Sequence, residues 1–361
     1  MVFIFWLTLI PLIVWSNMYE GAKIVWFLSG GFFLTIFWIN KFIKEMDKIK
    51  FSKANLFYLL WLLILLIASL KGVHPLESIV GGSYRHQGVL FFLVVFLVGK
   101  TIELLSDKQR KSLVKCVALV TIIETAAVLL QITLGKTYFG RPPGTLGEAN
   151  AASGFIAMGS VFVFALLKNK KSVFVGLFIL LAIIFSDSRT GFLMFLVVCL
   201  GVAANRLRKI KLITYLFLLP IVIFPVFVFF TKASVLRPES KFENRALFWK
   251  MGLMQFGKSP FLGYGAESGE VIYDQAFEKA EMPLLGMMVD RSHNLIIDII
   301  LWSGILGLIP FSLWFYQETK NLLMKKKYLS IFALTGWLIF SFLQPLGVSH
   351  WIMLLFILRC L

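Results

Sequence analysis

Runs of hydrophobic residues, most of them 14 to 25 positions long, alternate along the whole chain with short polar stretches. An α-helix needs about 20 apolar residues to cross the hydrocarbon core of a bilayer, so this pattern is typical of membrane-spanning helices. No segment shows the strict alternation of apolar and polar residues that indicates a strand. The sequence therefore predicts an all-α, polytopic membrane protein with about 12 transmembrane helices in a single transmembrane domain, residues 1–361. The predicted spans are residues 2–15, 23–40, 54–71, 88–104, 113–134, 149–167, 171–186, 190–205, 211–231, 292–316, 329–344 and 348–359.

The composition supports lipid as the solvent for this chain. Hydrophobic residues make up 59% of it and charged residues only 15%, whereas about a quarter of a typical soluble domain is charged. A formal net charge of +17 would suggest nucleic-acid binding in a soluble protein, but in a membrane protein it follows from basic cytoplasmic loops. We therefore predict membrane lipids as partners and no nucleic acid.

Lysine and arginine are divided unequally between the two sides of the predicted spans. The gaps that follow the even-numbered spans, together with the C-terminal end, hold 22 of these residues. The short gaps that follow the odd-numbered spans hold 6, and the long segment 232–291 holds 8. Cytoplasmic loops carry the excess of positive charge, and long loops escape this rule. Both termini are therefore expected in the cytoplasm, and residues 232–291 are expected to form one long extracytoplasmic loop. All four histidines then lie on the outer side: His74, His86, His293 and His350.

Two outer segments in the first half of the chain place polar residues at membrane depth. Arg85 and His86 could bind an anion, or they could anchor the following span at the interface. The segment from Arg141 to Asn150 holds two prolines and two glycines, which exclude a regular helix. Irregular backbone beside a membrane is tolerated where it lines a cavity or lies within protein. The small residues at 151–154 favour close helix packing.

Two further outer segments carry candidate chemistry. Arg189 begins a helix, where the dipole disfavours a cation, so it needs Asp187 or a phosphate ligand nearby. Within 232–291, apolar residues at 247, 248, 251 and 254 predict a short amphipathic helix on the membrane face, with Arg245 and Trp249 one turn apart. His293 is expected at a helix N-terminus, where it is either structural or a neutral imidazole that can accept a proton.

Two carboxylates, Glu124 and Asp298, lie within predicted spans, where a charge needs a partner or a cavity. Asp298 could pair with an outer arginine or be protonated. The outer loops contain no Asp-x-Asp pair and no clustered His or Cys ligands, so neither a metal nor a cofactor is predicted.

Together these segments resemble the O-antigen ligase and polymerase family of bacterial envelope glycan enzymes, over about residues 140–310. The resemblance rests on the Gly-Thr-x-Gly-x-x-Asn pattern ending at Asn150, on Ser188-Arg189-Thr190-Gly191, and on a block that runs from Arg245-x-x-x-Trp249 through Pro260-x-x-Gly263-x-Gly265 to His293-Asn294 and Gly304-x-x-Gly307.

The resemblance implies a multi-span glycosyltransferase of the bacterial inner (cytoplasmic) membrane with a periplasmic active site. It would take a glycan from an undecaprenyl-pyrophosphate carrier and pass it to a hydroxyl of a lipid or protein acceptor. Carried over onto this sequence, Arg189, Arg245 and Arg141 would bind the pyrophosphate, His293 would be the general base, and Asn294 would help to position it. Arginines can stabilise the charge that grows on the leaving group without a metal, so metal-independent catalysis is expected. The supporting candidates are Arg85, His86, Asn150 and Trp249.

Three alternatives remain open from the sequence. A polymerase of lipid-linked repeat units needs the same arginines and histidine as a ligase. A transporter or flippase of an anionic lipid would use these residues for binding alone, and it would need charges along a path to both faces. A structural membrane protein would use them for packing only.

Overall fold

The computed structural model describes residues 1–361 except 16–18, 46–48, 83, 168, 208–242 and 281–288. Its described residues form helices and no strand beyond one isolated bridge between Tyr138 and Arg141, which confirms the all-α class. The helices are α1 (Val2–Leu9), η1 (Ile10–Leu12), α2 (Tyr19–Glu45), α3 (Lys53–Lys71), α4 (Pro75–Val80), α5 (Val89–Leu104), α6 (Asp107–Thr133), α7 (Ala149–Leu166), α8 (Asn169–Phe185), α9 (Arg189–Leu207), α11 (Glu243–Phe256), α12 (Gly269–Lys279), α13 (Leu295–Met324), α14 (Tyr328–Leu343) and α15 (Val348–Cys360).

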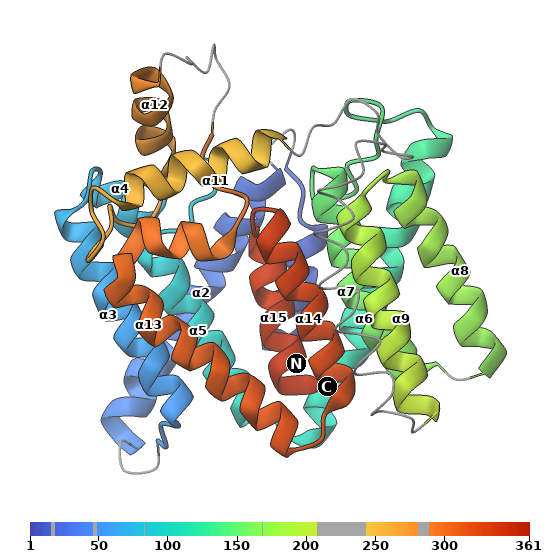
Figure 1. Cartoon of the computed structure of the whole chain (residues 1–361). Coiled ribbons are helices and arrows are strands. Elements are labelled where there is room, and N and C mark those ends of the chain that lie inside the picture. Colours follow the sequence, from blue (N-terminus) through green and yellow to red (C-terminus); the bar gives the residue numbers. More distant parts are fainter. Residues whose placement is uncertain (16–18, 46–48, 83, 168, 208–242, 281–288) are drawn as a thin grey trace.

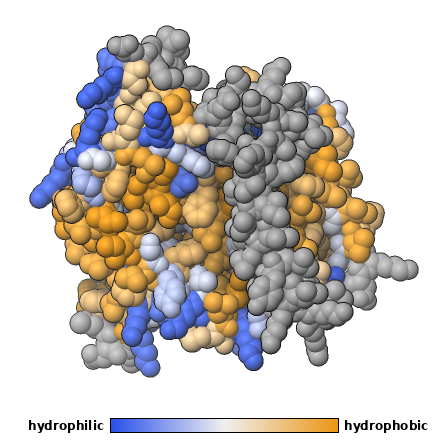
Figure 2. Space-filling view, in the orientation of Figure 1, coloured by the Kyte–Doolittle hydropathy of each residue, from blue (hydrophilic) through white to orange (hydrophobic). Residues whose placement is uncertain are grey.

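Helices occupy eleven of the twelve predicted spans. The remaining predicted span, 211–231, lies outside the described residues. Six of them, α2, α3, α6, α7, α9 and α13, are long and apolar enough to cross a membrane. Hydrophobic side chains form a band around the middle of the visible face, with hydrophilic ones gathered toward its two ends (Figure 2). The number of crossings and the orientation of the termini stay predictions.

The segment predicted as one long outer loop, 232–291, contains two helices in its described part. Helix α11 matches the predicted amphipathic helix, but the prediction that its apolar face lies on the membrane is wrong for most of that face. Met251 is buried, and Phe248 packs on Tyr273 and Phe277 of α12. Helix α12 was not predicted. Helices α4, α11 and α12 lie together at one end of the bundle, away from both chain termini (Figure 1).

Helix α7 lies deep in the bundle, and its small residues explain how. A Cβ on Gly154 would overlap the ring of Phe340 on α14, and a Cβ on Gly159 would overlap Thr121 on α6. Glycine at these positions therefore lets two helices approach α7 closely. Gly154 belongs to the run of small residues at 151–154 for which close packing was predicted, and Gly159 lies beyond it.

A break in α13 explains two of the glycine motifs, Pro260-x-x-Gly263-x-Gly265 and Gly304-x-x-Gly307. Gly304 has φ 61° inside the helix, and the amides of Ile305 and Leu306 bond to the carbonyls of Pro260 and Phe261 instead of to their own helix. In return, the amide of Tyr264 donates to the carbonyl oxygen of Leu301 at 2.7 Å. The turn that follows α11 is thus inserted into α13, which changes direction there (Figure 1). This insertion fixes α11 above the start of α13.

Replacing Gly304 with alanine is expected to destabilise the fold by about 1–3 kcal/mol, because a side chain there is strained at positive φ and would also overlap the Phe261 carbonyl. Thermal unfolding in detergent measures the loss. Gly336→Ala on α14 is the matched control, since the nearest atoms to its Cβ lie at 4.0 Å and alanine favours a helix interior. Equal unfolding temperatures for the two variants would contradict the inserted turn.

Candidate functional site

His293 lies immediately before α13 with its backbone at φ 59°, in the left-handed region. The three residues before it, 290–292, are each fixed to a different part of the chain. Non-glycine residues keep this conformation only where their surroundings over-determine it. The placement of His293 is therefore a feature of the tertiary structure.

The first attachment is the ion pair of Asp290 with Arg85, whose guanidinium also lies 5.1 Å from the ring centroid of Tyr84. Burial by itself would raise the pKa of Asp290, but Arg85 and Arg291 outweigh it and lower that pKa below its usual value. Asp290 in turn raises the pKa of Arg85 against the effect of burial. Both groups are therefore charged at neutral pH.

The second attachment is the ion pair of Arg291 with Glu267, in which the side chains are only 3% and 7% exposed. The Arg291 guanidinium also lies 4.2 Å from the ring centroid of Trp302 on α13. A buried pair of this kind is costly to break from one side, because the remaining charge is left without a partner. Arg291 thus ties the chain before His293 to the turn that follows α11.

The third attachment is Ser292, whose backbone amide donates to Oδ1 of Asp298 at 2.8 Å. On the other side of His293, Oδ1 of Asn294 accepts hydrogen bonds from the amides of Ile296 and Ile297 and caps α13. Asn294 therefore orders the helix start beside the histidine, and Asp298 lies close to both Ser292 and Arg291 rather than being isolated in the span.

The imidazole of His293 packs against Phe248 of α11, with ring centroids 6.0 Å apart. Burial, Arg245 and Arg85 lower the pKa of His293 to about 4, against a smaller opposing effect of Asp290. Its Nδ1 has no hydrogen-bond partner among the described residues. The imidazole is therefore neutral at physiological pH, as predicted, but burial and two cations are the cause where the sequence argument had invoked the helix dipole.

Arg245 and Arg189 come from α11 and α9 and lie close enough to influence each other. Burial lowers the pKa of Arg245, Glu148 raises it, and Arg189 lowers it again. Two cations brought together in a partly buried place favour a shared anion. Arg245 thus lies within electrostatic range of both Arg189 and His293.

Arg141 binds the turn between α8 and α9, which lies 45 positions further along the chain. Its Nε donates to the carbonyl oxygen of Ser186 at 2.8 Å, and its Nη2 lies 3.1 Å from the carbonyl oxygen of Asp187 and 2.8 Å from Oδ1 of Asn150. Asn150 in turn donates to Glu148 at 2.7 Å. These contacts brace the turn that presents Arg189.

The 141–150 loop is also held from below by groups within the helices. Glu124 of α6 accepts hydrogen bonds from the amide and the hydroxyl of Thr145. The ammonium group of Lys23, a fully buried residue, lies 2.7 Å from the Thr145 carbonyl oxygen. Glu124, whose partner the sequence left open, thus holds this loop in place.

The two remaining supporting candidates are His86 and Trp249. His86 lies at φ 52° in the segment that carries Arg85, and Trp249 lies one turn after Arg245 on α11. The structure adds Asp290, Glu267 and Glu148, which the sequence argument did not select. Asp290 adjoins Arg291 and Glu148 shares the loop of Arg141, which was a signal that could have found them, whereas Glu267 has no arginine near it in the sequence. Among the described residues, no group of His, Cys, Asp and Glu is arranged to hold a metal ion.

Comparison with known proteins gives one family. Residues 174–312 match the family model described as O-Antigen ligase. No curated protein matches the chain. The matched region begins in α8, continues through the Arg189 turn, α11 and α12, and ends within α13 after Gly307. The motif that ends at Asn150 lies outside this match. The chain is thus a multi-pass membrane protein whose residues 174–312 match the O-antigen ligase family, which confirms the resemblance predicted from the motifs between Ser188 and Gly307.

Proposed function

We propose that this protein transfers a glycan from an undecaprenyl-pyrophosphate carrier to an acceptor hydroxyl at the extracytoplasmic face of the bacterial inner membrane. The observation that carries the proposal is the juxtaposition of a neutral histidine with a pair of arginines, at one end of the bundle and inside the O-antigen ligase region. A base beside an anion-binding pair is the arrangement that this reaction requires.

The arginine pair serves the leaving group in this proposal. Arg189 and Arg245 bind the pyrophosphate, whose negative charge increases as the bond to the anomeric carbon breaks. Arg141 acts on the turn that carries Arg189. The acceptor oxygen attacks from the side opposite the pyrophosphate, which inverts the anomeric carbon.

The histidine serves the acceptor. Its imidazole takes the proton from the hydroxyl as the new glycosidic bond forms, and a general base of this kind contributes about 10²–10⁴-fold. A pKa of about 4 makes His293 a weak base in the free protein. An anion bound at Arg245 cancels part of the positive field on the imidazole, so binding of the donor raises the base strength when it is needed.

The same site fits a polymerase, in which the acceptor is a second lipid-linked unit. Product length separates the two reactions, because a ladder of repeats marks a polymerase and a single transfer marks a ligase. A transporter would leave the glycosidic bond to the carrier intact.

Reconstitution tests the proposal directly. Purified protein in lipid vesicles is supplied with an undecaprenyl-pyrophosphate glycan and a hydroxyl acceptor, and the expected result is a glycosylated acceptor with release of undecaprenyl pyrophosphate. Transfer is expected to continue in excess chelator. Intact donor after prolonged incubation with a range of acceptors would overturn the proposal, and loss of activity restored by Mg²⁺ would overturn its metal-independent part.

The pH dependence of transfer follows from the pKa of His293. Because the base must be unprotonated, kcat/KM is expected to stay level from about pH 8 to about pH 5 and to fall as the pH approaches the His293 pKa of about 4. The fall in kcat is expected at a higher pH, since kcat reports the donor-bound state. A fall in kcat/KM centred near the ordinary histidine pKa of about 6.5 would contradict the assignment.

A further inference from the structure

We propose that Asp298 is a positioning residue, which fixes the imidazole of His293 by holding the backbone of the turn before α13. This inference rests on the proposed function, since it treats His293 as the group whose place matters. The backbone of His293 is left-handed, a conformation that side-chain-bearing residues rarely adopt.

The contacts of Asp298 bracket the histidine. Oδ1 lies 2.8 Å from the amide nitrogen of Ser292 and 2.7 Å from its hydroxyl oxygen. The same hydroxyl lies 2.7 Å from the carbonyl oxygen of Asn294 and accepts a bond from the Asn294 amide at 3.0 Å. Because the hydroxyl has one hydrogen, it donates either to Asp298 or to Asn294. The residues on both sides of His293 are thus joined through Ser292, and Ser292 is joined to Asp298.

These bonds are distinct from the ordinary capping of α13. Asn294 already supplies the N-cap through the amides of Ile296 and Ile297. Asp298 reaches back six positions, past the cap and past His293, to Ser292. The carboxylate therefore constrains the turn rather than the helix.

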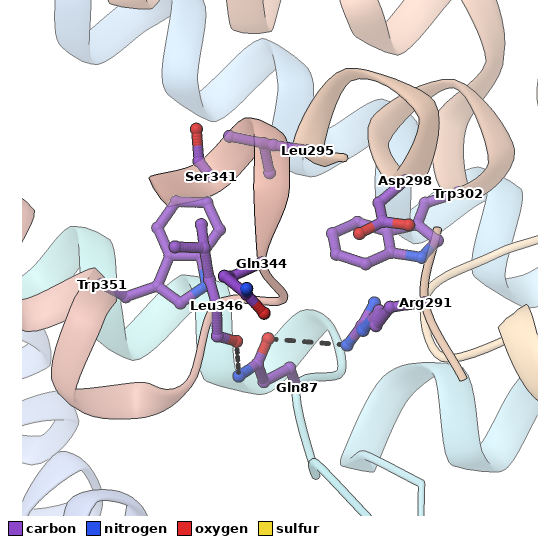
Figure 3. Close-up of a pocket in the computed structure, with 9 residues that line it drawn as sticks. All are labelled: Gln87, Arg291, Leu295, Asp298, Trp302, Ser341, Gln344, Leu346 and Trp351. Atoms are coloured by element: carbon purple, nitrogen blue, oxygen red, sulfur yellow. Dashed lines mark hydrogen bonds between the residues drawn. The ribbon is translucent and has the colours of Figure 1, made fainter. Parts of the chain in front are cut away.

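The surroundings of Asp298 exclude direct contact with a glycan. The residue is 6% exposed and lines a cavity of about 10 Å³ together with Arg291, Gln87 and Gln344. A space of this size holds about one water molecule. Figure 3 shows Asp298 and Arg291 facing this cavity beside Trp302. Asp298 acts through Ser292 and does not touch the reacting groups.

The turn that Asp298 holds keeps the imidazole of His293 in a defined environment. Phe248 covers one side of its ring, and Arg245 and Arg85 supply the positive field. If the turn relaxes, the imidazole leaves this environment, becomes more accessible and loses that field. Release of the turn therefore lowers turnover without removing the arginines that bind the donor.

Three variants test the inference: Asp298→Asn, Asp298→Ala and Ser292→Ala. Asparagine retains an oxygen that accepts the Ser292 amide, so a kcat within about threefold of wild type is expected. Alanine leaves no acceptor, and kcat is expected to fall at least about 30-fold while KM for the donor changes less than about twofold. Ser292→Ala keeps the amide bond but loses the hydroxyl, and an intermediate kcat is expected. Asp274→Ala on α12, an exposed position, is the control and should behave as wild type.

A second measurement does not depend on transfer. Diethyl pyrocarbonate modifies neutral imidazole, and mass spectrometry of the His293 peptide gives the rate against pH. In Asp298→Ala the His293 reaction is expected to be at least about tenfold faster at neutral pH, with its midpoint moved toward 6.5; Asp298→Asn should resemble wild type. If the wild-type protein transfers no glycan, the proposed function fails, whereas the modification experiment still tests whether Asp298 fixes His293.

Either of two results would overturn the inference. One is an unchanged His293 reaction profile in folded Asp298→Ala protein. The other is equal loss of kcat in Asp298→Asn and Asp298→Ala, which would show that charge rather than hydrogen-bond geometry is required. Should Asp298→Ala fail to fold, an unchanged His293 profile in Ser292→Ala overturns the inference in its place.

Discussion

Replacing His293 with alanine is expected to lower the turnover of glycan transfer by about 10²–10⁴-fold, the contribution of a positioned general base. Donor binding should change little, because the imidazole is neutral at working pH, with its pKa lowered to about 4, and the arginines that bind the pyrophosphate remain. Single-turnover transfer in vesicles gives the rate of the chemical step, and equilibrium binding of the lipid-linked donor gives its affinity.

His74→Ala is the matched control for this experiment. His74 lies at the same end of the bundle, before α4, and is exposed to solvent. It should retain wild-type turnover. Near-normal turnover in His293→Ala, with the protein folded and the donor bound, would falsify the assignment of His293 as the base.

Replacing Arg245 with alanine is expected to lower kcat by about 10²–10³-fold, the effect of removing one preorganised donor from a developing negative charge. A similar loss is expected for Arg189→Ala. Because the two cations bind the same anion, the double variant should lose less than the product of the single effects. Lysine at either position keeps the charge but not the planar two-pronged geometry, so partial activity is expected.

Arg245→Gln has a second expected effect, on the base. Among the charges near His293, Arg245 lowers the pKa of the imidazole most, so its removal should move the acidic fall of kcat/KM to higher pH. Lys250→Ala is the control, since Lys250 is exposed on the same helix, and it should change neither rate nor profile. An Arg245→Gln profile that coincides with wild type would separate Arg245 from the histidine and contradict a shared site.

The alternatives make different predictions for these variants. A transporter would lose ligand binding in the arginine variants but would keep full function in His293→Ala, because binding alone needs no base. A structural protein would show a change in unfolding temperature and no change in any reaction. The described charges support transfer, since Arg245 and Arg85 act on His293 and Arg189 acts on Arg245.

Helix positions and family could be predicted from the sequence because both depend on local patterns. Apolar runs define a span whatever their partners are, and eleven predicted spans coincide with helices such as α3 and α6. The motifs around Arg189 and His293 were sufficient to indicate the O-antigen ligase family. Helix α12 was missed, although Ile272, Tyr273, Ala276 and Phe277 form a helical face that packs inward.

Only the tertiary structure decided which groups meet. Arg85 pairs with Asp290 across 205 positions, and Arg141 holds the Ser186 carbonyl across 45. Gly304 is needed because the turn after α11 enters α13 at that point. Residue type fixes what a side chain can bind, but burial and the approach of distant helices fix what it does bind. For the same reason the low pKa of His293 follows from burial and from Arg245 and Arg85, which are both distant from it in the sequence.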